Sequence, residues 1–200
     1  MTMQEIFSIF SEYMQSGGFV MWPLFVASLI LWYTLGYRFH ALKRGTKKSV
    51  RNVVRKHREG KRGTKTGLID TAVTEAIDIR DNCKDAKISR KLMDDVFYKH
   101  LVESKKFSRL SNTIVISAPL TGLLGTVIGM IETFDSLASA ALFSQSGGIA
   151  GGISQALFTT QLGLVVAVPG LIMGRFLDRK AENIEKDLDQ IKDLLCSEEV

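Results

Sequence analysis

Among the polar residues inside long apolar stretches, four carry oxygen atoms that could bind or pass a cation. Thr126 interrupts one stretch, and Gln155, Thr159 and Thr160 interrupt another. Hydroxyl and amide oxygens are suitable ligands for hard cations, and polar side chains inside a membrane are costly unless they face a partner or a water-filled cavity. We therefore expect these side chains to line a polar lumen. The simpler alternative is that each threonine only bonds a carbonyl of its own helix.

Two rows of small residues accompany these polar positions. Each row follows steps of four, three and four residues, which places its members on one helix face. The rows are Ala118, Gly122, Gly125 and Gly129, and then Gly163, Ala167, Gly170 and Gly174. Small residues at such spacing let neighbouring membrane helices approach closely. We expect a larger side chain at Gly125 or Gly129 to weaken an oligomer before it weakens the fold.

The glycine spacing does not indicate a phosphate-binding loop. The stretch GLLGTVIG matches neither GxGxxG nor GxxxxGK[ST], and no strand pattern precedes it. The polar and small residues must therefore be positioned by helices in a membrane. They require no nucleotide and no catalytic chemistry, so we expect a protein that is not an enzyme.

Three apolar stretches can supply those helices. Residues 19–37, 114–131 and 153–173 contain no charged side chain, and each holds one of the three prolines. At about 1.5 Å per residue, even the shortest of them is about as long as the hydrocarbon core of a bilayer is thick. The sequence therefore predicts an all-α membrane protein with three transmembrane helices and long helical extensions in the cytoplasm.

The distribution of charge predicts the orientation. Of the 26 Lys and Arg residues, 21 fall in residues 38–109 and 5 in residues 175–200. Residues 1–18 and 132–152 hold acidic residues and none that is basic. By the positive-inside rule the N-terminus lies outside and the C-terminus in the cytoplasm. Because residues 1–18 are acidic, we expect the first span to be retained and not cleaved as a signal peptide.

The resulting division of the chain has seven parts. They are an outer amphipathic helix at 1–18, spans at 19–37, 111–134 and 153–174, a cytoplasmic helical loop at 38–110, an outer loop at 135–152, and a cytoplasmic helical tail at 175–200. Residues 68–121 contain one proline, Pro119, and no glycine. One long helix can therefore continue the second span into the loop. Apolar stripes are expected at Leu92, Val96 and Leu101 of the loop, and at Ile184, Leu188, Ile191 and Leu195 of the tail.

The cytoplasmic loop begins with a strongly basic segment. Residues 38–65 carry 12 Lys or Arg and one acidic residue. No aromatic residue lies between Ala41 and Lys65 to stack on bases, so we expect anionic lipid and no nucleic acid as the partner of this segment. Cys83 and Cys196 lack CxxC spacing and are expected to be free thiols, and the three histidines lack metal-ligand spacing.

Two of these stretches together resemble one known family. APLTGLLGTVIGMIETF and GISQALFTTQLGLVVAVPG are similar to the second and third spans of the ExbB/TolQ/MotA family of ion-channel subunits. The three-span layout with the N-terminus outside resembles ExbB and TolQ more than the four-span MotA. Residues 1–110 match that family only in layout.

The resemblance implies a homopentamer around a dimer of single-span ExbD- or TolR-like partners, whose membrane aspartate carries the ion. Thr126 and Thr160 fall on the positions of the lumen-facing threonines of the family. Where proton-driven members usually have a glutamate, in GIAEAL, this chain has Gln155 in GISQAL, so a titrating role at that position is lost. The resemblance also implies the inner membrane of a Gram-negative bacterium, with residues 1–18 in the periplasm.

The identity of the ion depends on Thr159. Proton-type members commonly have alanine at this position, whereas sodium-type stators resemble this chain in having two threonines. A Na⁺ ion at Thr126, Thr159 and Thr160 is therefore the alternative to H⁺, which the ExbB-like layout favours. Adjacent helical residues point about 100° apart, so only one of the two threonines is expected to face the lumen squarely.

The sequence thus predicts a channel subunit that couples the ion motive force, through its ExbD/TolR-like partner, to a TonB- or TolA-like protein for outer-membrane transport. A TolQ-like role in envelope maintenance and another stator role within the family stay open. The alternative from a different class is a non-conducting membrane scaffold, in which the glycines only pack helices and the threonines only satisfy backbone carbonyls.

Overall fold

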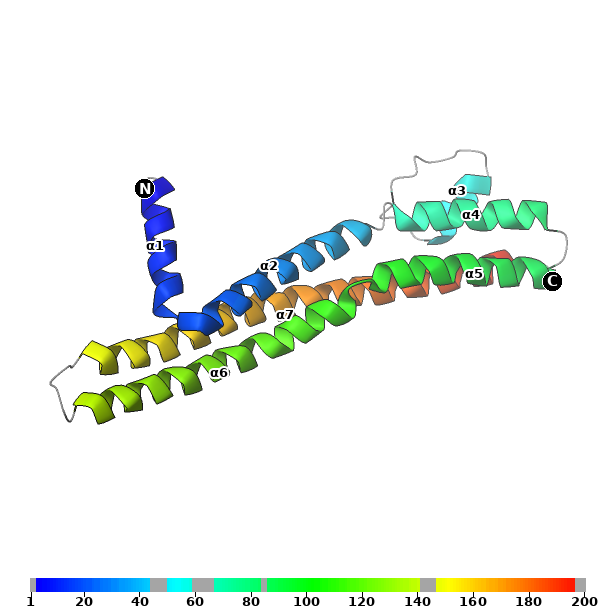
Figure 1. Cartoon of the computed structure of the whole chain (residues 1–200). Coiled ribbons are helices and arrows are strands. Elements are labelled where there is room, and N and C mark those ends of the chain that lie inside the picture. The colour runs from blue at the N-terminus through cyan, green and yellow to red at the C-terminus, as the bar shows by residue number, and fades with distance from the viewer. Residues whose placement is uncertain (1–2, 44–49, 59–66, 84–85, 141–146, 197–200) are drawn as a thin grey trace. The chain divides into compact units, whose positions relative to one another are not determined.

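A computed structural model describes residues 3–43, 50–58, 67–83, 86–140 and 147–196, and these residues form seven helices (Figure 1). The helices are α1 (Met3–Ser16), α2 (Gly18–Ala41), α3 (Val50–Arg58), α4 (Leu68–Asn82), α5 (Ala86–Lys105), α6 (Ser108–Ala140) and α7 (Gly147–Cys196). Within these ranges there is no strand. Three stretches of helix, found in α2, in α5 with α6, and in α7, are long and apolar enough to cross a membrane. The predicted all-α membrane class is confirmed.

The chain divides into two compact units. The first comprises residues 1–35 and 109–174, and the second comprises residues 36–108 and 175–200. α2, α6 and α7 therefore contribute residues to both units. All three prolines lie inside helices, Pro23 in α2, Pro119 in α6 and Pro169 in α7. Proline is tolerated in membrane helices because neighbouring groups satisfy the backbone carbonyls that it frees.

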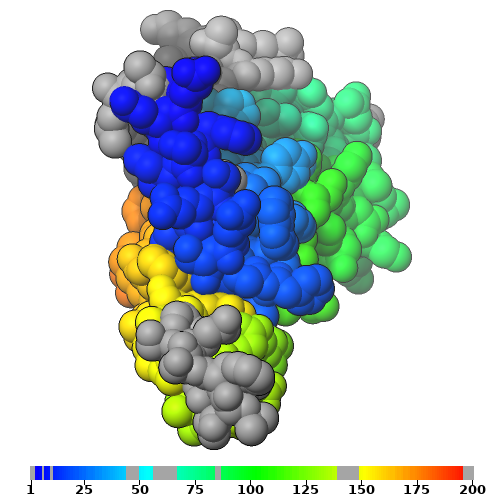
Figure 2. All heavy atoms as spheres, turned by 60° about the vertical axis from the view of Figure 1, so that its left-hand side comes forward, coloured from blue at the N-terminus to red at the C-terminus, as the bar shows by residue number. Residues whose placement is uncertain are grey.

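In the first unit, α6 and α7 lie side by side and antiparallel, and α2 lies along α7 (Figure 1). α1 turns sharply away from α2 at Gly18, whose φ of 65° is a backbone conformation that glycine adopts easily. The ring of Tyr13 on α1 meets the ring of Phe158 on α7 edge-on, with centroids 5.0 Å apart. Burial raises the pKa of the Tyr13 hydroxyl, which therefore stays neutral. Figure 2 shows α1 and the start of α2 against the first turns of α7.

In the second unit, α4 and α5 pack as a hairpin, α3 contacts α4, and the last turns of α7 complete the core. The expected stripe of the tail is buried: Ile184, Leu188, Ile191 and Leu195 are each at most 2% exposed. The expected stripe of α5 is wrong by one residue, because Leu92 is 40% exposed whereas Met93 and Phe97 are buried. Leu92 and Val96 have the same spacing of four as Met93 and Phe97, and it is the Met and Phe side chains that fill the core.

The loop and the second span are two helices, not the one long helix that the sequence allows. α5 ends at Lys105 and α6 begins at Ser108. Between them Phe107 has a φ of 63°, in the left-handed region that ends helices and is rare for large residues. The rings of Phe107 and Tyr37 meet edge-on with centroids 5.3 Å apart, which helps to hold this conformation.

Candidate functional site

The predicted small residues bring the backbones of α6 and α7 into contact. A Cβ atom added at Gly129 would lie 2.6 Å from the carbonyl oxygen of Gly152, and one added at Gly163 would lie 2.9 Å from that of Ala118. A Cβ atom at Gly122 would lie 3.1 Å from the carbonyl oxygen of Thr159. We call this contact the glycine seam and define it by Ala118, Gly122, Gly125 and Gly129 of α6 and Gly152, Ala156 and Gly163 of α7.

The glycine seam lies within one chain. Its backbone atoms cannot move aside as a flexible side chain can, so a larger residue at Gly129 must separate α6 from α7. The expectation that such a change weakens an oligomer before the fold stays a prediction; because the contact lies within the chain, we expect the fold to be affected as well. Gly152, which no sequence pattern singled out, completes the seam, because a Cβ there would meet Thr133 and the carbonyl oxygen of Gly129.

The rest of the second small-residue row has mixed surroundings. Ala167 is buried, and a Cβ atom at Gly170 would lie 2.7 Å from Cδ2 of Leu31 on α2 and 2.9 Å from Cγ2 of Val115 on α6. Gly170 therefore allows three helices to meet. Gly174 differs, because a Cβ atom there would meet nothing within 4 Å.

Thr159 is enclosed in the glycine seam. Thr159 is only 1% exposed. Its hydroxyl oxygen lies 3.0 Å from the carbonyl oxygen of Ala156, 3.2 Å from that of Gln155 and 3.5 Å from that of Gly122. A Cβ atom at Gly125 would collide with this side chain. The position argues against the expectation that Thr159 supplies an oxygen to Na⁺, since an ion there would need space that the two backbones occupy.

Thr126 and Thr160 lie at the edge of the seam and are half-buried. Thr126 comes four residues after Gly122 of the seam, and Thr160 comes four residues after Ala156. Four residues of an α-helix make about 40° more than one full turn, so each threonine is rotated by the same angle, and in the same direction along its own helix, from a seam residue. Because α6 and α7 are antiparallel, the same sense of rotation brings both threonines to the same side of the helix pair. The Thr126 hydroxyl donates to the carbonyl oxygen of Leu123 at 2.7 Å, and the Thr160 hydroxyl donates to that of Ala156 at 3.0 Å.

Gln155 lies on the other side of the seam. It precedes Ala156 by one residue, which rotates it in the opposite sense, and its side-chain amide contacts Gly18 at the start of α2. Its Nε2 donates to Oε1 of Glu132 on α6 at 3.2 Å. The expected set of lumen residues is therefore divided between two faces of the helix pair. Glu132, which the sequence indicated only as outer acidic charge, places a carboxylate beside the position where the family usually has a glutamate.

A second polar cluster, which the sequence did not predict, lies in the second unit. Arg38, with a side chain 2% exposed, donates through Nη2 to Oδ1 of Asp178 at 2.7 Å, and Asp178 Oδ1 also accepts from the Ser108 hydroxyl at 3.0 Å. Nε of Arg38 is buried and has no partner among the described residues. The cluster joins the end of α2, the start of α6 and α7.

The three long apolar helices and the glycine seam between two of them define a helical membrane protein. A model of the MotA/TolQ/ExbB proton channel family matches residues 48–190, and this chain belongs to that family. The predicted resemblance is thereby confirmed.

Individual relatives match the chain over shorter stretches. The putative biopolymer transport protein ExbB-like 3 of Synechocystis sp. is 42% identical over 69 residues, 34% of this chain and 33% of that protein. Biopolymer transport protein exbB1 of Vibrio cholerae is 34% identical over 87 residues, 42% of this chain and 38% of that protein. Biopolymer transport protein ExbB of Aquifex aeolicus is 42% identical over 77 residues, 38% of this chain and 50% of that protein. The matches thus span between a third and a half of these relatives.

Proposed function

We propose that this chain is an ExbB-like ion-channel subunit of a bacterial inner membrane. It assembles as a homopentamer around an ExbD- or TolR-like dimer of single-span partners and couples ion flow to a TonB- or TolA-like periplasmic protein. The observation that carries the proposal is the placement of Thr126 and Thr160 on the same side of the α6–α7 pair, in a family of channel subunits. That face is the lumen, and the opposite face holds Gln155 and α2.

The ion carrier is the aspartate of the partner, because residues 114–131 and 153–173 of this chain contain no carboxylate. The two threonines supply oxygen atoms beside that aspartate, since each hydroxyl that donates to its helix keeps lone pairs free to accept. Neutralising the aspartate changes the face that the partner prefers, and repeated events drive relative rotation. The membrane potential supplies about 2.3 kcal/mol per charge per 100 mV.

The ion is H⁺. The enclosure of Thr159 supports this choice, because the Na⁺ alternative depended on an oxygen from that residue. Residues 1–18 and 135–152 lie in the periplasm, the spans are 19–37, 111–134 and 153–174, and residues 38–110 and 175–200 lie in the cytoplasm. The basic segment attracts anionic lipid, but its residues 44–49 and 59–66 lie outside the described part of the chain.

The decisive experiment replaces both edge threonines by the isosteric valine. In proteoliposomes that contain the chain and its single-span partner, the double variant Thr126→Val/Thr160→Val should lose proton uptake driven by a potassium diffusion potential. Thr159→Val is the matched control and should retain uptake, because it is the neighbouring threonine but is enclosed. Full uptake by the double variant would disprove the channel role of this face.

A non-conducting scaffold remains the second candidate function, and one observation favours it. Each hydroxyl of Thr126, Thr159 and Thr160 already bonds a carbonyl of its own helix. A scaffold predicts that the double valine variant assembles with its partners and supports function as well as the wild type does. The same experiment therefore separates the two candidates.

A further inference from the structure

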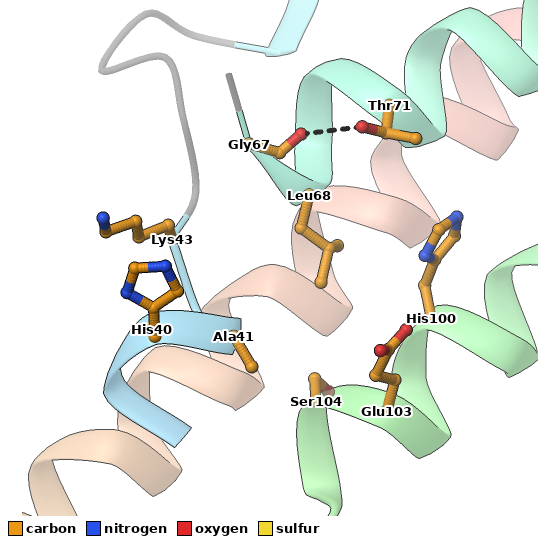
Figure 3. Close-up of a pocket in the computed structure, with 9 residues that line it drawn as sticks. All are labelled: His40, Ala41, Lys43, Gly67, Leu68, Thr71, His100, Glu103 and Ser104. Atoms are coloured by element: carbon orange, nitrogen blue, oxygen red, sulfur yellow. Dashed lines mark hydrogen bonds between the residues drawn. The ribbon is translucent and has the colours of Figure 1, made fainter. Parts of the chain in front are cut away.

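One side of α5 in the second unit packs against its own chain. Met93 and Phe97 on this side are buried in the core. His100 and Ser104 of α5 line a pocket of about 380 Å³ together with Leu68 at the start of α4 (Figure 3). Contacts within the unit therefore occupy the side of α5 that is turned toward α4.

The opposite side of α5 carries an exposed stripe that contains large apolar side chains. We call it the outer face of α5 and define it by Ile88, Leu92, Asp95, Lys99 and Val102. These residues follow steps of four, three, four and three, the spacing by which one helix packs along another. Ile88, Leu92 and Val102 are 55%, 40% and 53% exposed. Charged side chains lie between them, so the outer face suits another protein surface better than it suits lipid.

The last turns of α7 carry an exposed row of charged side chains. We call it the tail face and define it by Glu182, Lys186, Asp189 and Asp193, which follow steps of four, three and four. All four are exposed, and the row lies across the helix from the buried stripe that begins at Ile184. Three of its four members are acidic, so the tail face favours a neighbour that offers basic side chains.

The exposed charges of α5 are of the opposite sign on balance. Five exposed side chains of this helix are basic and three are acidic: Lys87, Arg90, Lys91, Lys99 and Lys105, and then Asp94, Asp95 and Glu103. The outer face of α5 and the tail face of α7 are therefore complementary in net charge. Both faces belong to the second unit, but they point away from the core of that unit.

Two ion pairs within the chain fix the register between α5 and α7. Nζ of Lys105 lies 2.8 Å from Oε2 of Glu185, and Nζ of Lys192 pairs with Oδ1 of Asp94. The later residue of α5 pairs with the earlier residue of α7, so the two helices run antiparallel here. These pairs mark two heights along the unit at which a residue of α5 and a residue of α7 are level with each other.

Lys99 and Asp189 lie at the same height in this register. Each stands about midway between the two ion-paired residues of its own helix. Neither forms an ion pair with another of the residues that the structure describes. Copies related by rotation about an axis along the membrane normal keep every residue at its own height. Lys99 of one copy and Asp189 of the next copy are therefore level as well.

We propose that the outer face of α5 packs against the tail face of α7 in a second copy of this chain, with Lys99 beside Asp189. Each copy uses both faces, so the contact is heterologous and repeats around a closed ring. Val102 comes level with Lys186, whose aliphatic stem can cover it. The inference rests on the proposed assembly of several copies, but it does not depend on ion conduction by the α6–α7 face.

The same register predicts one unfavourable pair within the contact. Asp95 and Asp193 each follow an ion-paired residue by one position, so they are level and bring like charges together. Lys91, one turn earlier on α5, partly offsets them. Asp95→Asn should therefore increase the fraction of assembled copies, a result that a misfolded variant cannot give.

The first test cross-links two kinds of full-length chain in native membranes. Both carry Cys83→Ser and Cys196→Ser; one also carries Lys99→Cys, and the other carries Asp189→Cys with a different affinity tag. A short bifunctional thiol reagent should join the two kinds of chain, whereas chains with Lys99→Cys alone should not be joined to one another. The matched control replaces Asp189→Cys by Asp78→Cys, which is exposed on α4 outside both faces, and the product should then be lost.

The second test reverses charge and measures the assembled fraction by native mass spectrometry at one protein concentration. Lys99→Glu places like charges together and should lower that fraction at least about threefold. Lys99→Glu/Asp189→Lys restores opposite charges and should recover the wild-type fraction. Asp78→Lys is the control for a charge change elsewhere on the unit and should have no effect.

The outcomes separate failure of this contact from failure of assembly. If the wild type assembles but the Lys99–Asp189 product does not form, or the charge swap does not restore the assembled fraction, the contact is overturned and the proposed assembly stands. If the wild type is monomeric in both assays, the contact and the proposed assembly are overturned together.

Discussion

Thr159 and Thr160 are neighbours of identical chemistry with different environments. Thr159 lies between two backbones and is 1% exposed, whereas Thr160 lies at the edge of the seam and is half-buried. The rotation of about 100° between adjacent helical residues is enough to separate a packing role from a lumen role. Which of the two threonines is enclosed depends on the face of α7 that α6 packs against. That face is determined by the glycines of α6, which lie 30 to 40 positions earlier in the chain.

Gly129→Ala should destabilise the chain by about 2 kcal/mol, because its new Cβ would lie 2.6 Å from the backbone oxygen of Gly152. Gly151→Ala is the matched control, since a Cβ there meets nothing within 4 Å, and it should be neutral or slightly stabilising. Unfolding of both variants in detergent would be followed by circular dichroism. Equal stability of the two variants would contradict the close contact at Gly129.

Removal of Na⁺ should not affect ion transport. With choline in place of Na⁺ at fixed pH and at the same K⁺ gradient, proton uptake should be unchanged in the wild type and in Thr159→Ala, because Thr159 has no space for an ion. The measurement is the same proteoliposome uptake assay, repeated in each salt. Uptake by the wild type that stops without Na⁺ would reject both the assignment to H⁺ and the packing role of Thr159.

At the scale of the elements, apolar length and periodicity were sufficient to predict three spanning helices and a helical second unit. They could not predict the break at Phe107, because neither Gly nor Pro marks it and a left-handed phenylalanine is held by tertiary contacts such as that with Tyr37. They also could not pair Arg38 with Asp178, which lie 140 residues apart. The periodicity of α5 allowed two stripes, and only packing decided between them.

Asp178→Asn should cost about 2 kcal/mol of stability, because it leaves the charge of the buried Arg38 without its ionic partner. The matched control is Glu185→Gln. The partner of Glu185, Lys105, is exposed, so this change should cost less than about 1 kcal/mol. Thermal unfolding with hydrogen exchange at α2 and α7 would measure both variants. A cost no greater for Asp178→Asn than for the control would show that Arg38 does not need this carboxylate.

At the scale of the whole molecule, the helices of the first unit expose a large apolar surface. Exposed aliphatic and aromatic side chains occur on all three long helices, for example Trp32 on α2, Leu124 on α6 and Val165 on α7. An apolar surface of this extent requires lipid or other subunits. Since the glycine seam is already closed within the chain, we expect the proposed assembly to use these larger side chains.

Orientation can be tested with the cysteines that the chain already carries. In intact spheroplasts a membrane-impermeant thiol reagent should not label the wild type, because the charge distribution predicts Cys83 and Cys196 to lie on the cytoplasmic side. It should label Ser144→Cys, in the loop that is predicted to lie outside, but not Ser49→Cys; both positions lie outside the described residues. Labelling of the wild type only after permeabilisation is the positive control, and labelling of Ser49→Cys before it would reverse the topology.

The closed seam between α6 and α7 also bears on how the chain is made. The ribosome completes α6 before α7, so the groove of Gly122, Gly125 and Gly129 is first presented to lipid without its partner. Once α7 leaves the translocon, the two helices can close as a hairpin through their own backbones, with no other subunit present. A chain that stops before residue 147 would keep an unfilled groove, which membrane proteases and chaperones could recognise as unfinished. Quality control can thus act on each single chain before assembly begins.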